Sequence, residues 1–351
     1  MRPLLSWPPK DQLSKEFKGH NAIQMLIPSL PSLPIVDISA FVSGKGTFEE
    51  KTVTAKAIDS ACREFGFFYL IGHGLSEHEV SEIRTLSCDF FALPLEEKEE
   101  ISIEKTDLAR GYQRIGQNIT KYAKDWHEGI DLYAPVGPEH IIKKRGLQTL
   151  SGTNPIPARP ANFQDVVDRY VEKMQALGMA TMQAMAMGLG LPEHCFDSSM
   201  DNSFWVMRMI GYPPLMKEDA DVGISCGEHT DYGCLTILNT DETTGALQVK
   251  SKSGEWINAD PIPGAFVINI GDMVNVWTNE LYTSTLHRVI HTKDSFRISV
   301  PFFFEPNFDA IIAPLPECVK MSGKPALFQP LLYGDHLLGK VNSNFDVSTG
   351  K

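Results

Sequence analysis

The sequence has no run of five consecutive basic residues, and acidic side chains outnumber basic ones. It contains 44 aspartates and glutamates against 32 lysines and arginines, which gives a formal net charge of -12. Nucleic acids and anionic membranes are bound through basic patches. The charge pattern therefore excludes a non-specific nucleic-acid or membrane surface, and any anionic ligand has to meet a local positive group.

Paired cysteines and long apolar stretches are also missing. The six cysteines are widely spaced and never form a C-x-x-C pair, so neither a zinc ribbon nor a dithiol redox site is indicated. No stretch approaches the roughly 18 uninterrupted apolar residues of a membrane-spanning helix, and the first twenty residues lack the apolar segment of a signal peptide. We expect reduced thiols and a cytoplasmic protein that does not enter a membrane.

The first half of the chain mixes strand and helix patterns. Residues 33–39 alternate apolar and polar side chains as a strand does, and residues 67–73 form a short aromatic strand pattern. Helical apolar spacing covers 47–65 and 77–94. The acidic segment 96–101 is interpreted as the solvated continuation of the second helix.

The second half of the chain is predicted to be mainly β. Residues 162–189 fit one long helix whose methionines recur at the spacing of core residues, and from Phe204 onward seven or eight short β-like runs are separated by turn residues. We predict a mainly β protein with α-helices, built as a double-stranded β-helix (jelly-roll) core with an N-terminal α/β helical jacket. The predicted segments are an arm (1–32), an N-terminal region (33–150), a connection with the long helix (151–202), the core (203–310) and a C-terminal segment (311–351).

Three residues in the second half have the pattern of a metal site. His229 and Asp231 are two positions apart in GEHTDYG (227–233), so on a strand their side chains project from the same face. His287, in STLHRVIH, could supply a third ligand from a later strand. An Fe(II) centre that binds a cosubstrate and dioxygen together needs three protein ligands on one side and open positions opposite them. The residues predict a 2-His-1-carboxylate Fe(II) site.

A carboxylate-binding pair follows the third ligand. Arg297 lies ten residues after His287, and Ser299 shares its strand face. A guanidinium and a hydroxyl together bind a carboxylate, and an arginine buried in an apolar strand is costly unless it meets an anion. We interpret the pair as the binding site for the distal carboxylate of 2-oxoglutarate.

With these residues in this order, the chain resembles the isopenicillin N synthase-like family of Fe(II)/2-oxoglutarate oxygenases. The resemblance runs from about residue 33 to 340 and includes REFGFFYLIGHGL, RGY, GYPP, HTDYGCLTIL, PGAFVINIGDMVNVWTN and RISVPFFFEPN. It implies an iron site and a 2-oxoglutarate site, formed respectively by His229, Asp231 and His287, and by Arg297, Ser299 and Tyr212.

The resemblance also points to residues that contact the substrate, and it has one departure. Many plant members of the family carry Asn where this chain has Ile210, so a polar contact to the cosubstrate or to a metal-bound water is missing or replaced. Arg208 shares a strand face with Ile210, and it could compensate, bind an acidic substrate or pair with a neighbouring acid. Tyr112, Gln113 and Arg114 lie in a loop that in the family faces the pocket mouth, which makes them candidates for substrate contact.

The family resemblance implies an oxidoreductase of small-molecule metabolism. It would be a 2-oxoglutarate/Fe(II)-dependent dioxygenase that consumes O2, releases succinate and CO2, and uses ascorbate as reductant in vitro. Hydroxylation, desaturation and ring closure stay open, as do purine, pyrimidine, amino-acid and alkaloid-like substrates and the oligomeric state. The alternatives are an isopenicillin N synthase-type oxidase using Fe(II) and O2 without 2-oxoglutarate, a catalytically inactive ligand-binding homologue, and a cupin-like hydrolase or isomerase with another metal.

Overall fold

The protein is represented by a computed structural model that describes residues 33–344 except 108, 121–122, 215–224 and 293. The predicted arm of residues 1–32 lies outside the described residues. In the described part, none of the helices has the length and apolar character needed to cross a bilayer. The predicted division of the chain into five segments stays a prediction.

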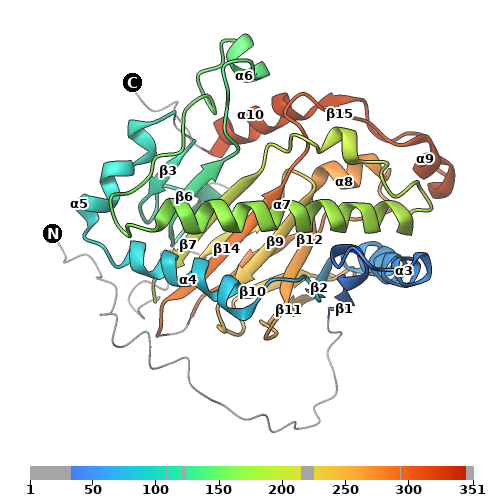
Figure 1. Cartoon of the computed structure of the whole chain (residues 1–351), viewed down its shortest axis with the longest axis horizontal. Coiled ribbons are helices and arrows are strands. Elements are labelled where there is room, and N and C mark those ends of the chain that lie inside the picture. The colour runs from blue at the N-terminus through green and yellow to red at the C-terminus, as the bar shows by residue number, and fades with distance from the viewer. Residues whose placement is uncertain (1–32, 108, 121–122, 215–224, 293, 345–351) are drawn as a thin grey trace, which may run out of the picture.

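A large twisted sheet forms the centre of the molecule (Figure 1). Its four central strands pair antiparallel and come from the second half of the chain, whereas both edges are built by the first half. From edge to edge the strands are β1 (Ile35–Asp37), β2 (Phe67–Ile71), β12 (Phe266–Ile270), β9 (Leu235–Thr240), β14 (Arg297–Phe304), β7 (Val206–Tyr212), β6 (Glu128–Tyr133) and β3 (Gly111–Gln113).

A smaller antiparallel sheet lies against one face of the large one. Its strands, in spatial order, are β11 (Trp256–Asn258), β10 (Leu247–Lys250), β13 (His287–Val289) and β8 (Cys226–His229). Side chains from both sheets line a common cavity, which places that cavity between them. The two sheets form the predicted mainly β jelly-roll core.

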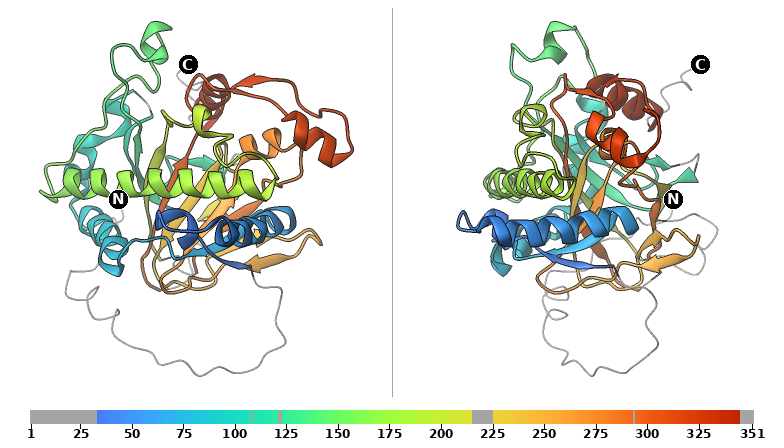
Figure 2. Two further views of the ribbon diagram at one scale, coloured as in Figure 1. Left: turned by 45° about the vertical axis from the view of Figure 1, so that its right-hand side comes forward. Right: turned by 90° about the vertical axis from the view of Figure 1, so that its right-hand side faces the viewer.

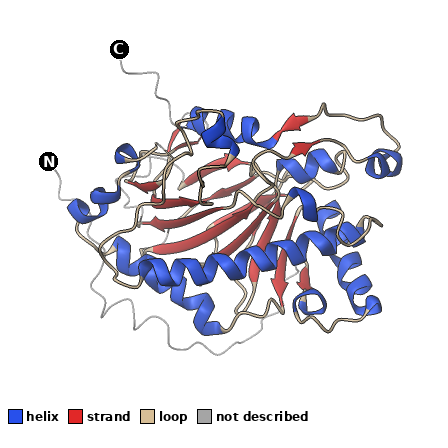
Figure 3. Ribbon diagram, turned by 45° about the horizontal axis from the view of Figure 1, so that its top comes forward, coloured by secondary structure: helices blue, strands red, loops and turns tan. Residues whose placement is uncertain are grey.

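Helices cover the opposite face of the large sheet, as Figures 1 and 3 show. The long helix α7 (Phe163–Gly188) runs across the strands, beside α3 (Phe48–Glu64) and α4 (Glu77–Phe91). Both shorter helices begin with a capping box, in which a Thr47 or Ser76 hydroxyl and a glutamate three residues later bond to each other's backbone N–H. These helices are the predicted jacket.

The helix α7 packs closely on β14 because of one glycine. A Cβ atom at Gly178 would collide with the ring of Phe304, so a larger residue would push the helix off the sheet. The methionines Met174, Met182 and Met185 of this helix are buried, as their spacing predicted.

One local prediction was wrong. Residues 96–101 do not continue α4, because Pro94 separates that helix from the short helix α5 (Leu95–Lys98) and the 3-10 turn Glu99–Ile101. Lys98 and Ile101 are buried rather than solvated.

The remaining elements lie around the two sheets, and the C-terminal helix lies at one end of the core (Figure 2). They are the helices α2 (Ser39–Val42), α6 (Ile141–Lys144), α8 (Asp272–Trp277), α9 (Pro316–Ser322) and α10 (Tyr333–Asn344), the 3-10 turns Ile103–Lys105 and Asp197–Ser199, and the strands β4 (Ile119–Thr120), β5 (Ala123–Lys124), β15 (Ile311–Ile312) and β16 (Leu331–Leu332).

Candidate active site

Two strands of the small sheet bring the three predicted metal ligands together. His229 ends β8, and His287 begins β13 directly opposite it in the ladder; Asp231 lies two residues beyond β8. The Nε2 atoms of the two histidines are each 3.6 Å from Oδ1 of Asp231. One ligand atom from each residue falls within 4.8 Å of the other two. This spacing suits a single ion.

Hydrogen bonds behind the two histidines fix which atoms face that point. The Nδ1 atoms of His229 and His287 lie 2.7 Å and 3.1 Å from the carbonyl oxygens of Gly227 and Thr285. A carbonyl can only accept, so each Nδ1 carries a proton and each Nε2 can present a lone pair to an ion. Burial, together with the neighbouring His229, lowers the pKa of His287 to about 4, which keeps that imidazole neutral at pH 7.

The pKa of His229 shifts in the opposite direction to that of His287. Burial opposes a charge on His229, but Cys226 and Asp231 outweigh it and raise its pKa to about 10. A metal ion bound at this point would take the place of the proton on Nε2 of His229, since metal binding requires deprotonated ligands.

The carboxylate of Asp231 is oriented in the same way as the imidazoles. Its Oδ2 accepts hydrogen bonds from the Thr236 hydroxyl and from Nδ2 of Asn269, the latter at 2.6 Å. Burial opposes ionisation of Asp231, but the adjacent imidazoles and these hydrogen bonds outweigh it and lower the pKa. Oδ1 is left to face the two Nε2 atoms. Two imidazoles and one carboxylate on one side are the donor set that non-haem Fe(II) prefers.

A cavity of about 80 Å³ between the two sheets joins this triad to Arg297, Ser299 and Tyr212. Arg297 and Tyr212 are direct partners on β14 and β7, and the guanidinium lies 4.8 Å from the centre of the tyrosine ring. Ile210, the departure from the family, is the ladder partner of Ser299 and lines the same cavity.

The guanidinium of Arg297 has hydrogen-bonding capacity that the protein does not use. It is 2% exposed, and Nη2 donates to the Thr240 hydroxyl at 3.1 Å. Nε and Nη1 are buried without a partner among the described residues. Buried N–H groups without partners are costly, so this guanidinium keeps donors available for an anionic ligand such as a carboxylate.

Sequence reasoning missed a histidine in the wall of this cavity. His127 is buried, with Nδ1 2.8 Å from the Ser225 carbonyl oxygen and Nε2 3.0 Å from Nδ2 of Asn118. Its ring centre is 5.4 Å from that of Tyr212. Burial, with a contribution from Arg208, lowers its pKa to about 3, so it is a neutral acceptor for the asparagine.

A second cavity, of about 120 Å³, meets the first at His229 and Asp231. Arg208 lines both cavities. The other walls of the second cavity come from β6, β7, the end of β14 and helix α10, and include Asp131, Tyr133, Tyr232, Phe303, Glu305 and Leu337.

Arg208 pairs with a neighbouring acid, which is one of the three roles that the sequence left open for it. Its Nε lies 2.6 Å from Oδ1 of Asp131, the residue opposite it on β6, and Nη2 is buried without a partner among the described residues. Gln113 donates from Nε2 to Oδ2 of Asp131 at 2.7 Å. Gln113 is therefore placed behind the cavity wall, where it holds the aspartate.

The two neighbours of Gln113 do not line either cavity in the described part of the chain. Tyr112 is buried in the edge strand β3, not in a loop, and its hydroxyl donates to Glu128 at 2.6 Å. The same carboxylate pairs with Lys98 at 2.7 Å. Arg114 is half-exposed and lies 3.4 Å from Glu99.

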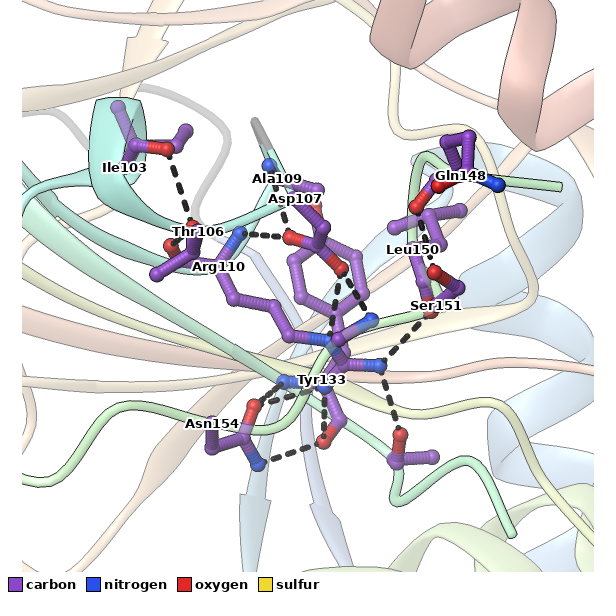
Figure 4. Close-up of polar contacts among 12 residues, drawn as sticks. Ile103, Thr106, Asp107, Ala109, Arg110, Tyr133, Gln148, Leu150, Ser151 and Asn154 are labelled. Carbon is purple, nitrogen blue, oxygen red and sulfur yellow. Dashed lines mark hydrogen bonds and ion pairs between the residues drawn. The ribbon is translucent and has the colours of Figure 1, made fainter. Parts of the chain in front are cut away.

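A buried arginine outside the cavities supports the wall that Tyr133 provides (Figure 4). The Arg110 guanidinium donates to the backbone carbonyls of Tyr133, Ala134 and Leu150, at distances of 3.0 to 3.2 Å, and it pairs with Asp107 at 3.3 Å. These contacts tie the end of β6 to the connection that follows it.

Comparison with known proteins places this fold and site in a family. Residues 198–306 match the model of the 2OG-Fe(II) oxygenase superfamily, and residues 33–158 match that of the non-haem dioxygenase in morphine synthesis N-terminal region. The chain belongs to the 2OG-Fe(II) oxygenase superfamily. It is thus an oxidoreductase that depends on Fe(II), 2-oxoglutarate and O2, and the predicted reaction class is confirmed.

Individual relatives extend over nearly the whole chain. Homoarginine-6-hydroxylase of Oryza sativa subsp. japonica is 41% identical over 324 residues, which cover 90% of this chain and 98% of the relative. A probable iron/ascorbate oxidoreductase of Dictyostelium discoideum is 36% identical, with coverage of 80% and 83%. The crystal structure of a full-length Neurospora crassa protein in complex with alpha-KG and thymine aligns with a TM-score of 0.77 at 29% identity, covering 89% and 96%. The relatives named for a substrate act on small molecules.

Proposed function

We propose that His229, Asp231 and His287 hold the Fe(II) ion, and that Arg297, Ser299 and Tyr212 hold the distal carboxylate of 2-oxoglutarate. One observation carries this assignment. The buried Arg297 has two N–H groups without a partner among the described residues, in the same cavity as the three inward-facing ligand atoms.

The bound iron would supply the oxidation of a substrate C–H bond, coupled to conversion of 2-oxoglutarate and O2 into succinate and CO2. The chain's own contribution is orientation and exclusion of water. Backbone carbonyls hold the two imidazoles, Asn269 and Thr236 hold the aspartate, and the rigid ladder between β7 and β14 sets the carboxylate-binding end. The position of the cavity between the two sheets limits the access of bulk water to the reacting groups.

We further propose that the substrate is a small polar molecule that enters the second cavity and contacts Arg208. Amino acids are the first candidates, because a relative 41% identical over nearly its whole length is named a homoarginine hydroxylase. The partly unpaired guanidinium of Arg208 at the junction of the two cavities supports a ligand with an oxygen acceptor. Hydroxylation is the expected outcome.

The test is substrate-dependent succinate release. Purified protein is incubated with Fe(II), ascorbate, 2-oxoglutarate and O2, with homoarginine, arginine, lysine or thymine in parallel. We expect succinate in step with hydroxylated product for at least one amino acid. His229→Ala should abolish turnover, and His78→Ala, which removes an exposed histidine, should not. Substrate oxidation without succinate would overturn the proposed role of Arg297 and favour an oxidase that does not use 2-oxoglutarate.

A further inference from the structure

Glu305 is a buried acid in the second cavity to which neither the metal site nor the 2-oxoglutarate site assigns a task. It directly follows β14 and lies eight positions beyond Arg297, on the strand face that alternation gives to Arg297, Ser299 and Phe303. The same strand thus carries the cosubstrate arginine at one end and this carboxyl group at the other.

The surroundings of Glu305 are built to accommodate its carboxyl group. The side chain is 4% exposed, and Oε2 has no hydrogen-bond partner among the described residues. A Cβ atom at position 233 would collide with this carboxyl group, so the glycine at that position leaves room for the carboxyl group of Glu305. Burial raises the pKa of Glu305 to about 8, although Tyr333 and the backbone of Cys234 partly offset the rise. The ionised form of this buried carboxyl group is therefore costly until a cation lies beside it.

Within the described part of the chain, the cavity walls offer Glu305 no cation that is not already paired. Arg208 is the only lysine or arginine among the described residues that line it, and Arg208 is already paired with Asp131 at 2.6 Å. Asp231 faces two imidazoles. Glu305 is then the acid of the cavity without a cation beside it, and a cationic ligand would stabilise its ionised form.

We propose that Glu305 binds a cationic end group of the substrate, a guanidinium or an ammonium, and thereby selects cationic substrates over neutral molecules of the same shape. This inference rests on the proposed function, because it assigns the second cavity to the substrate. A site that hydrogen-bonds a charged group rejects the analogue that lacks it, since its own buried group is then left unpaired. Glu305 is a specificity residue and is not expected to affect binding of iron or of 2-oxoglutarate.

The experiment compares charged and neutral ligands of nearly identical shape. Protein loaded with Fe(II) and 2-oxoglutarate is kept free of oxygen and titrated by calorimetry with homoarginine and with homocitrulline, in which a urea replaces the guanidinium. Lysine and 2-aminoheptanoic acid, in which a methyl group replaces the side-chain ammonium, form a second pair. The same titrations are run on Glu305→Gln and on the control Glu242→Gln, which removes an acid from an exposed position.

We expect the wild-type protein and Glu242→Gln to bind the cationic member of at least one pair about 30-fold or more tightly than the neutral member, the loss typical of leaving a buried charge unpaired. Glu305→Gln should lose most of that difference while it binds 2-oxoglutarate with unchanged affinity. The proposal is overturned if wild-type protein binds no cationic compound, if it prefers the neutral members, or if Glu305→Gln retains the preference. Failure to bind 2-oxoglutarate would instead contradict the proposed function.

Discussion

Replacing Arg297 by Met should have opposite effects on cosubstrate binding and on the stability of the ligand-free protein. The guanidinium is 2% exposed and has no carboxylate within salt-bridge distance among the described residues, so the ligand-free protein buries a charge without a counter-ion. Methionine replaces the apolar stem of the arginine and carries no charge. Thr240 retains a hydrogen bond after the change, because its hydroxyl also lies 3.3 Å from the Ile298 carbonyl oxygen.

The size of the effect follows from the two N–H groups of Arg297 that have no protein partner. If one of them makes a charge-assisted hydrogen bond to 2-oxoglutarate, worth about 1.5 to 3 kcal/mol, its loss raises the Kd for 2-oxoglutarate by about 10- to 10²-fold. Without 2-oxoglutarate, the free energy of unfolding should stay equal or increase by up to about 3 kcal/mol, because a buried charge is removed. The lost contact with the Tyr212 ring, 4.8 Å away, offsets part of that gain.

Two measurements check this prediction. Anaerobic titration of the Fe(II)-loaded protein gives the Kd for 2-oxoglutarate, and urea unfolding with and without 2-oxoglutarate gives the stabilisation by ligand, about 2.7 kcal/mol for wild type at a hundredfold excess over Kd. Arg169→Met, at an exposed position of α7, is the matched control. If the Arg297→Met variant binds 2-oxoglutarate normally, or unfolds several kcal/mol more easily without it, the reasoning is refuted.

Three further changes test other parts of the structure. Asn269→Leu removes a hydrogen bond to the triad's aspartate, and we expect about 10- to 100-fold weaker Fe(II) binding in a metal titration, with unchanged unfolding of the metal-free protein as the control. Tyr112→Phe should lower the free energy of unfolding by about 1 to 3 kcal/mol, because the buried Glu128 loses a donor, and should leave the substrate KM unchanged; a raised KM would instead make Tyr112 a substrate contact. Gly178→Val should destabilise the protein by about 1 to 3 kcal/mol or more in urea unfolding, since α7 can no longer lie close to β14, and an unchanged midpoint would contradict that packing.

The sequence predicts the metal cluster because its geometry is largely local. His229 and Asp231 are two positions apart, and a ladder between neighbouring strands is enough to bring His287 opposite the first of them. Alternation along a single strand likewise places Arg297 and Ser299 in one cavity. Each of these predictions needs only the period of a strand and the pairing of two strands.

Residues whose role depends on distant partners were harder to predict. His127 bonds to Asn118 and to the Ser225 carbonyl group, the latter 98 positions away, and no spacing in the sequence signals that contact. Tyr112 was placed in a loop on the basis of the family resemblance, but pairing with β6 makes the segment a buried edge strand. Long-range pairing of this kind follows from tertiary structure rather than from local pattern.

Glu305 is the residue that sequence reasoning could have found. It continues the period-two series that starts at Arg297. An acid in the apolar segment FFFEP is costly to bury, just as an arginine in this strand is. The alternation along the strand was visible in the sequence, but an acid at a strand end is usually solvated. The structure adds that a Cβ atom at position 233 would collide with the Glu305 carboxyl group, so the surroundings of this group fit it closely.

The placement of Arg297 and Glu305 on one continuous strand has a consequence for regioselectivity. Eight residues of extended chain, at about 3.3 Å each, separate the two positions by roughly 26 Å along the strand axis. Arg297 lies at one end of the strand and Glu305 just beyond the other, and the two cavities that they line meet at His229 and Asp231. The carbon that is oxidised would be set by the number of bonds between a substrate's cationic group and that carbon, so that shortening the substrate by one methylene shifts the oxidised position along its chain.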